Sequence, residues 1–229
     1  TPDTIFDMAS LTKSVTTATS IMILIESGQL RLSDPVAKHW PEFAANGKET
    51  VTVEQCLLHT TGLTADNSIK DYVGTRKEML DRIAALKLEA PAGTRFRYSD
   101  VGFIVLGHLV ELISEKPLDE FAREKIFVPL KMNDTGFRIA GKTERPIAPS
   151  GNRNGKMIVG AVHDPRAFAL GGVAGHAGLF STADDLARRD LLDSTRAVSP
   201  LIVPQGAVVV DSTGRPIEDV VDEIVAMLK

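Results

Sequence analysis

The sequence has only one cysteine, Cys56, in 229 residues, so it can form neither an intrachain disulfide nor a thiolate cluster for a metal. Its five histidines show no H-x-x-x-H or H-E-x-x-H spacing, which argues against a zinc hydrolase. No apolar run reaches the ~18 residues that a membrane span needs. The net charge of -4 disfavours nucleic-acid binding. We therefore expect a soluble globular chain without cofactor, bound metal, membrane span or nucleic-acid partner.

Apolar periodicity is the main structural signal that is present. Hydrophobic residues make up 43% of the chain, enough for one core or for a core and a small appendage. The spacing of apolar residues predicts helices at 10–27, 52–58, 76–86, 101–114, 117–127 and 216–228. The segment 133–165 carries few periodic signals and is predicted to be rich in loops. We see no signal peptide and therefore expect a cytoplasmic chain.

A serine and a lysine stand three residues apart where the first predicted helix begins. Residues i and i+3 of a helix share one face, so the amine of Lys13 can reach the hydroxyl of Ser10 and take its proton. Taken alone, this S-x-x-K pattern is weak and is better explained by a serine N-cap followed by an exposed lysine. Because the helix is apolar or small on most sides, we expect Lys13 to be partly desolvated and able to act as a base.

A second candidate catalytic motif stands just before the apolar segment 101–113. This motif contains Tyr98 and Asp100. A tyrosine in this position can be a simple core or rim residue, but beside a serine and lysine pair it can also carry protons. His163 follows in a loop near a glycine-rich segment, where it can line a substrate cleft.

Residues 1–188 resemble the serine β-lactamase and penicillin-binding-protein superfamily, in particular its class C-like esterase branch. The matching phrases lie at 4–13, 28–36, 57–63, 91–100, 126–132 and 171–182. The resemblance implies that Ser10 is the nucleophile, Lys13 its activating base and Tyr98 the proton relay. Asp100 stands where the family usually has an asparagine, so its role as an amide donor to substrate is in doubt.

The resemblance implies an α/β (α+β) fold with a helical lobe beside an antiparallel sheet. Most of that sheet is expected to be missing here, and the apolar surface left uncovered would favour oligomers. The family's third box, K-T-G or H-x-G, has one match by letter, at His176 and Gly178. We expect these two residues, with Asp100 and His163, to be candidates for substrate binding, and activity to be low without the third strand.

The tail, residues 189–229, resembles the C-terminal end of bacterial cytidylate kinase and suggests a chimeric chain. That resemblance implies nucleotide contacts at Arg189, Asp193 and Arg196. The sequence contains no G-x-x-x-x-G-K-[ST] phosphate loop, so we expect these contacts to be vestigial.

Three functions remain open from the sequence. The first is a serine hydrolase that acts on small esters or amides through an acyl-serine intermediate, as esterases and D-amino-acid peptidases do. The second is a catalytically inactive fragment that serves as an interaction surface. The third is nucleotide binding through the tail. The hydrolase family that the chain resembles is often periplasmic or secreted, which competes with the cytoplasmic expectation.

Overall fold

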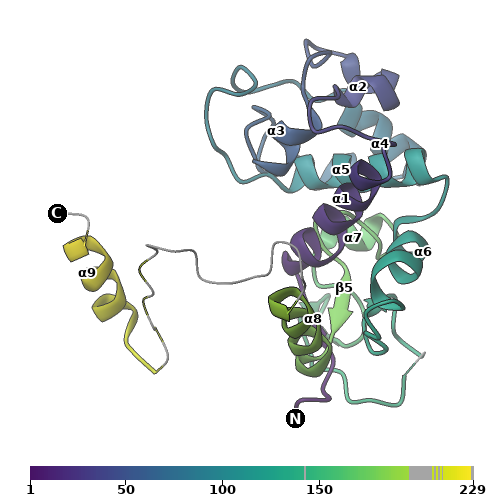
Figure 1. The fold of residues 1–229 in the computed structure, drawn as a ribbon. Coiled ribbons are helices and arrows are strands. Elements are labelled where there is room, and N and C mark those ends of the chain that lie inside the picture. Colours follow the sequence, from purple (N-terminus) through teal and green to yellow (C-terminus); the bar gives the residue numbers. More distant parts are fainter. Residues whose placement is uncertain (142, 196–207, 209, 211, 213, 228–229) are drawn as a thin grey trace. The chain divides into compact units, whose positions relative to one another are not determined.

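The computed structural model describes residues 1–141, 143–195, 208, 210, 212 and 214–227 (Figure 1). The chain forms two compact units, Thr1–Arg189 and Asp190–Lys229, and each is considered by itself. Within the described residues, no helix has the length and apolar character needed to cross a membrane.

A helical lobe makes up much of the first unit. Its central helix is α5 (Asp100–Ser114), which packs on α1 (Thr19–Glu26), on α3 (Val53–Leu57) and on the π-helical turn η1 (Lys13–Ala18) that leads into α1. Further helices are α2 (Val36–His39), η2 (Pro41–Ala44), η3 (Ile69–Asp71), α4 (Arg76–Ala84), α6 (Leu118–Ala122), η4 (Arg123–Phe127), α7 (Pro165–Ala169) and α8 (Ala183–Thr195). The helices predicted from apolar periodicity in this unit are confirmed, whereas α2, η2, η3, α7 and the 13-residue helix α8 were not predicted.

Helix α5 begins where the sequence places a capping residue. The hydroxyl of Ser99 accepts a hydrogen bond from the Gly102 amide at 3.1 Å, and the carboxylate of Asp100 lies in the first turn, where the helix dipole favours a negative charge. Most of the helix is buried on all sides. The helix ends at Glu115, which adopts a left-handed conformation. The apolar sequence therefore fixes α5 in the core, and its first turn carries the partly buried carboxylate of Asp100.

Two small antiparallel sheets complete the first unit. Strand β5 (Leu179–Ser181) lies between β1 (Phe6–Asp7) and β2 (Gly136–Phe137), with Asp7 opposite Phe180. Strands β3 (Gly151–Arg153) and β4 (Lys156–Ile158) form a hairpin. The segment 133–165 is thus more regular than predicted, because its strands are too short to give a periodic signal. The unit has the mixed α/β architecture that was expected, with a helical lobe and small sheets.

The loop before β5 lies directly against α5, and two glycines make this contact possible. A Cβ atom on Gly175 would lie 1.9 Å from the Phe103 carbonyl oxygen, and one on Gly107 would lie 2.8 Å from the Gly175 Cα. The hydroxyl of Thr17 donates to the Gly175 carbonyl at 2.7 Å. This contact brings residue 176, which follows Gly175, next to the helix that carries Lys13.

We expect Gly175→Ala to destabilise the first unit by more than about 2 kcal/mol, because the new methyl group would overlap backbone atoms that cannot rotate away. Gly136→Ala is the matched control, since Gly136 has open space around the position of a Cβ atom. Urea unfolding followed by circular dichroism measures both variants. Equal midpoints for the two would show that the loop and α5 separate easily.

In the second unit the described residues include α9 (Ile217–Met227), which confirms the helix predicted at 216–228. Its first acidic residues, Glu218 and Asp219, lie in the first turn, where a negative charge is favourable. Arg215, just before the helix, forms an ion pair with Glu223 at 2.6 Å.

Of the three residues predicted to contact nucleotide, only Arg189 is fully described by the structure. Arg189 lies on α8. The side chain of Asp193 and the whole of Arg196 lie outside the described residues.

Candidate active site

Ser10 and Lys13 form the contact that their spacing predicts. The Lys13 Nζ atom donates to Ser10 Oγ at 3.0 Å, and the Lys13 amide bonds the Ser10 carbonyl at 3.0 Å, which closes the first turn. Ser10 is exposed, whereas Lys13 is only 5% exposed. A solvent-accessible hydroxyl therefore faces a buried amine, which is the arrangement that an activated serine needs.

The turn that presents Ser10 is held by two side chains that sequence reasoning missed. Ala9, which precedes the serine, has a positive φ of 46°. Its amide donates to Asp7 Oδ1 at 2.9 Å, and its carbonyl accepts from the Thr12 hydroxyl at 2.7 Å. Thr12 also accepts from the Leu179 amide at 3.1 Å, which ties the turn to β5. Asp7 and Thr12 both lie in the segment 4–13, whose resemblance to the family was the sequence signal that could have identified them.

Asp7 also fixes the loop that follows β4. Its Oδ2 atom accepts from the His163 amide at 2.7 Å. The side chain of His163 is exposed and lies near Gly151. The structure thus places His163 near the nucleophile turn through its backbone, and its predicted contact with substrate stays a prediction.

Asp100 lies against Lys13. Its Oδ1 atom is 2.6 Å from Lys13 Nζ, and this buried contact is an ion pair without the directionality of a good hydrogen bond. The Lys13 ammonium also donates to the His176 carbonyl at 3.2 Å. Ser10, Asp100 and His176 therefore surround one amine with acceptors, matching the three donors of an ammonium group.

Tyr98 contacts Lys13 through its aromatic ring. The Nζ atom is 4.8 Å from the centre of the tyrosine ring, within the range of a cation–π contact. The Tyr98 ring belongs to a group of aromatic rings. The centre of the His59 ring lies 4.5 Å from that of Tyr98 and 5.1 Å from that of Phe103. Tyr98 is 46% exposed, so it remains accessible to a ligand.

His59 orders the chain that carries Tyr98. It adopts a left-handed φ of 57°, and its Nδ1 atom accepts from the Ser99 amide at 3.0 Å. Burial lowers the pKa of His59, and the positive charge of Lys13 lowers it further, against the opposing effect of Asp100. His59 is thus held neutral, with the lone pair of Nδ1 directed at the backbone.

We expect the free energy of unfolding to decrease as the pH falls through about 6.5, the usual pKa of histidine. The pKa of His59 is lowered in the folded state, so the unfolded chain binds the proton first and acid favours unfolding. His59→Asn should flatten this dependence, because asparagine tolerates a left-handed φ but does not titrate. Denaturant unfolding at several pH values measures the slopes. Identical slopes in the two proteins would assign the dependence to other groups.

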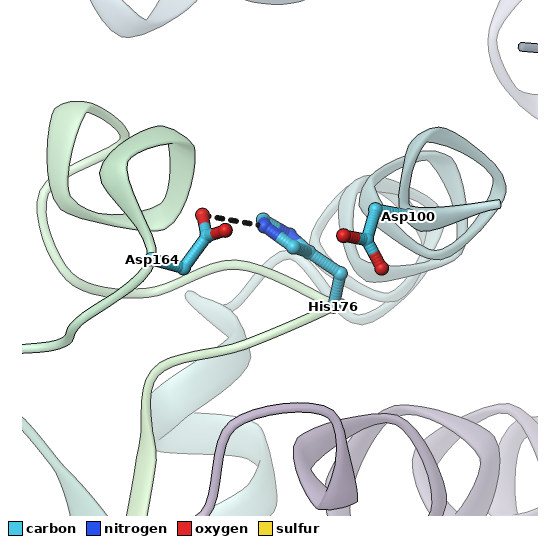
Figure 2. A group of neighbouring side chains, drawn as sticks. All are labelled: Asp100, Asp164 and His176. Atoms are coloured by element: carbon cyan, nitrogen blue, oxygen red, sulfur yellow. Dashed lines mark hydrogen bonds and ion pairs between the residues drawn. The ribbon is translucent and has the colours of Figure 1, made fainter. Parts of the chain in front are cut away.

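His176 is buried and its imidazole faces Asp164 (Figure 2). The Nε2 atom lies 2.9 Å from Asp164 Oδ1, and Asp164 also caps α7 by accepting from the Ala167 amide at 2.7 Å. Burial would raise the pKa of Asp164, but the hydrogen bond and charge of His176, with backbone donors, lower it to about 2. Asp164 is therefore a firmly ionised carboxylate.

The His176 carbonyl accepts a hydrogen bond from Lys13. An oxyanion hole is made of N–H donors, so this contact does not test the H-x-G match, and the role of His176 in substrate binding stays a prediction. Gly178 has a φ of 114°, and a Cβ atom there would lie 2.6 Å from the Gly172 carbonyl oxygen. Gly178 therefore serves the packing of its own loop, and its role in substrate binding stays a prediction.

The β-lactamase family model matches residues 1–223. The chain belongs to this family. Its match extends over most of the tail, and the comparisons do not support the resemblance to cytidylate kinase or a chimeric chain.

Two curated relatives show a similar level of identity. The chain is 32% identical to the "Putative D-alanyl-D-alanine carboxypeptidase" of Escherichia coli K12, over 82% of this chain and 50% of that protein. It is also 32% identical to the "N-acetylmuramyl-L-alanine amidase" of Bacillus subtilis 168, over 80% of this chain and 48% of that protein. The chain thus spans about half the length of these curated relatives.

A solved structure supports the fold. The octameric penicillin-binding protein homologue from Pyrococcus abyssi superposes with a TM-score of 0.71 at 28% identity, covering 87% of this chain and 47% of that one. The β-lactamase and penicillin-binding-protein fold expected from the sequence is therefore confirmed.

Proposed function

We propose that the chain is a serine hydrolase that acts on small esters or amides through an acyl-serine intermediate. The observation that carries this proposal is the 3.0 Å contact between Lys13 Nζ and the exposed Ser10 hydroxyl. A buried amine that touches an accessible hydroxyl is arranged for proton removal. The relatives, named as a carboxypeptidase and an amidase, support a serine hydrolase kind of activity.

Lys13 can serve as the base once its ammonium group has released a proton to the solvent. In the acylation step, the Ser10 oxygen then attacks the substrate carbonyl while its proton passes to the Lys13 nitrogen. The new Lys13 ammonium is then stabilised by the Asp100 carboxylate, 2.6 Å from Nζ. The carbonyl π electrons move onto oxygen, and collapse of the tetrahedral intermediate expels the alcohol or amine. Asp100 thus acts on the charge of the base, rather than on the substrate as the family pattern would imply.

Tyr98 is the group we assign to the leaving-group proton. Its ring contacts Lys13, and its partial exposure leaves the phenol within reach of a bound substrate. A proton passed from Lys13 through Tyr98 would neutralise the departing oxygen or nitrogen. Water then attacks the acyl-serine, the ester bond to Ser10 breaks, and the acid is released.

The substrate class is the finer part of the proposal. One relative is named for D-alanyl-D-alanine and the other for an N-acetylmuramyl-L-alanine amide, so both names describe amides. Small activated esters are acylated more easily than amides by the same nucleophile, because their leaving groups are better. We therefore propose esters as the practical assay substrates and D-amino-acid amides as a second class to test.

A fluorophosphonate probe is expected to label the wild-type chain, and Ser10→Ala should abolish the labelling. Ser14→Ala is the matched control, because Ser14 is an exposed serine one turn along the same helix and its hydroxyl only bonds the Leu11 carbonyl. Gel fluorescence after reaction with the purified proteins gives the result. Labelling that persists in Ser10→Ala would place the reactive serine elsewhere, and no labelling of the wild type would favour an inactive interaction module.

Lys13→Arg should reduce turnover of a chromogenic ester by at least about a hundredfold, since a guanidinium cannot accept a proton near neutral pH. Lys38→Arg is the control: Lys38 also pairs with a carboxylate, that of Asp34, but it is exposed. Steady-state kinetics and a thermal melt separate loss of catalysis from loss of folding. A folded Lys13→Arg variant with full activity would remove Lys13 from the mechanism.

A further inference from the structure

Asp164 is a charged residue beside the candidate site that the proposed mechanism does not use. It is the N-cap of α7, and its Oδ1 atom accepts from the Ala167 amide at 2.7 Å and faces His176 Nε2 at 2.9 Å. One oxygen of its carboxylate lies within 4.8 Å of a carboxylate oxygen of Asp100 (Figure 2). Asp164 thus neighbours two of the residues that contact the Lys13 amine, namely Asp100 and His176.

His176 links Asp164 to Lys13 through its own backbone. Its side chain is 1% exposed, so the imidazole is enclosed by the protein. The ring bonds Asp164, while the carbonyl of the same residue accepts from Lys13 Nζ at 3.2 Å. A buried ring that is hydrogen-bonded at its far end restricts the movement of the peptide to which it is attached. The bond to Asp164 therefore helps to fix the carbonyl that receives the Lys13 amine.

The charge of Asp164 is not balanced by the His176 ring. Asp164 is ionised, with a pKa of about 2. The Nδ1 atom of His176 is buried and has no hydrogen-bond partner among the described residues, so a proton there would be a buried donor without an acceptor. The network therefore favours a neutral imidazole with its proton on Nε2. Asp100 and Asp164 then carry two negative charges close to the single ammonium of Lys13.

We propose that Asp164 and His176 are positioning residues for the base of the proposed hydrolase, and that the charge of Asp164 favours the ammonium form of Lys13. This inference rests on the proposed function, in which Lys13 must lose its proton before it can accept one from Ser10. The titratable groups near the Lys13 amine come from several segments: Asp100 at the start of α5, Tyr98 and His59 before it, Asp164 at α7 and His176 before β5.

Asp164→Asn isolates the charge from the hydrogen bonds. Asparagine keeps the Oδ1 acceptor for His176 and Ala167 and remains a good N-cap, but it is neutral. Without the negative charge, the Lys13 ammonium should release its proton more readily. We expect the acid limb of the pH profile for fluorophosphonate labelling to move to lower pH by at least about 0.5 unit. At the foot of that limb, labelling should be about threefold faster than in the wild type, a gain that misfolding cannot produce.

Asp164→Ala tests the positioning, because it removes the acceptor as well as the charge. We expect kcat for a chromogenic ester to fall by about tenfold or more at the plateau pH, with KM within about threefold of the wild type. Asp34→Asn is the matched control for both variants. Asp34 also pairs with a lysine and a histidine, Lys38 and His39, so the same residue types meet there. This control should leave the pH profile and kcat unchanged.

An NMR titration separates this proposal from the hydrolase function. In the full chain labelled with ¹³C at lysine Cε, the Lys13 resonance, assigned with Lys13→Met, should titrate at lower pH in Asp164→Asn than in the wild type. That shift in a wild type without Ser10 labelling would remove the hydrolase function and support the charge link. The proposal is overturned if the resonance in Asp164→Asn titrates as in the wild type or at higher pH, if Asp34→Asn shifts it equally, or if folded Asp164→Ala keeps the full kcat of an active wild type.

Discussion

The arrangement of the candidate site depends on the burial of one ammonium group. Lys13 is 5% exposed, and a charge removed from water is tolerated only where it is paired and hydrogen-bonded. Its partners are the Ser10 hydroxyl, the Asp100 carboxylate and the His176 carbonyl. Each partner comes from a different segment, so satisfying this single charge requires the nucleophile turn, α5 and the loop before β5 to meet.

The loop before β5 reaches Lys13 because its neighbours permit a very close backbone approach. Gly175 lies against α5 at a distance that excludes any Cβ atom, and the Thr17 hydroxyl bonds its carbonyl. A second fastening comes from Arg76, which donates to the Leu170 and Val173 carbonyls and pairs with Glu111. The helical lobe thus holds the loop that carries His176. The geometry of the site therefore depends on the packing of the core.

The sequence predicted the local part of this site and missed the part that depends on tertiary contacts. Ser10 and Lys13 are three residues apart, so helix geometry alone indicates their contact. By contrast, the pairing of Asp164 with His176 depends on loops whose course has no periodic signal. The contact of Asp100 with Lys13 joins two helical segments, α5 and η1, that only the tertiary fold brings together.

The comparisons do not support the resemblance of the tail to a kinase. Its resemblance to a kinase rested on a short C-terminal stretch in which two expected arginines read as Leu191 and Leu192. An apolar strand followed by an amphipathic helix is common to many folds, so such a match carries little information about origin. The helix itself was predicted correctly as α9 from its amphipathic periodicity. The kinase assignment needed in addition a phosphate loop, which the sequence does not contain.

Asp100 shows how one substitution changes the electrostatics of the site. The family pattern has an asparagine here, whose amide is neutral and would leave the buried Lys13 ammonium without a counter-charge at 2.6 Å. A carboxylate compensates that charge, and Asp164 does the same for the facing imidazole whenever it is protonated. The gain has a chemical consequence, because an ionised carboxylate has no N–H to offer a substrate carbonyl. In the proposed hydrolase, the hydrogen-bond donor for the substrate carbonyl must therefore come from a residue other than Asp100.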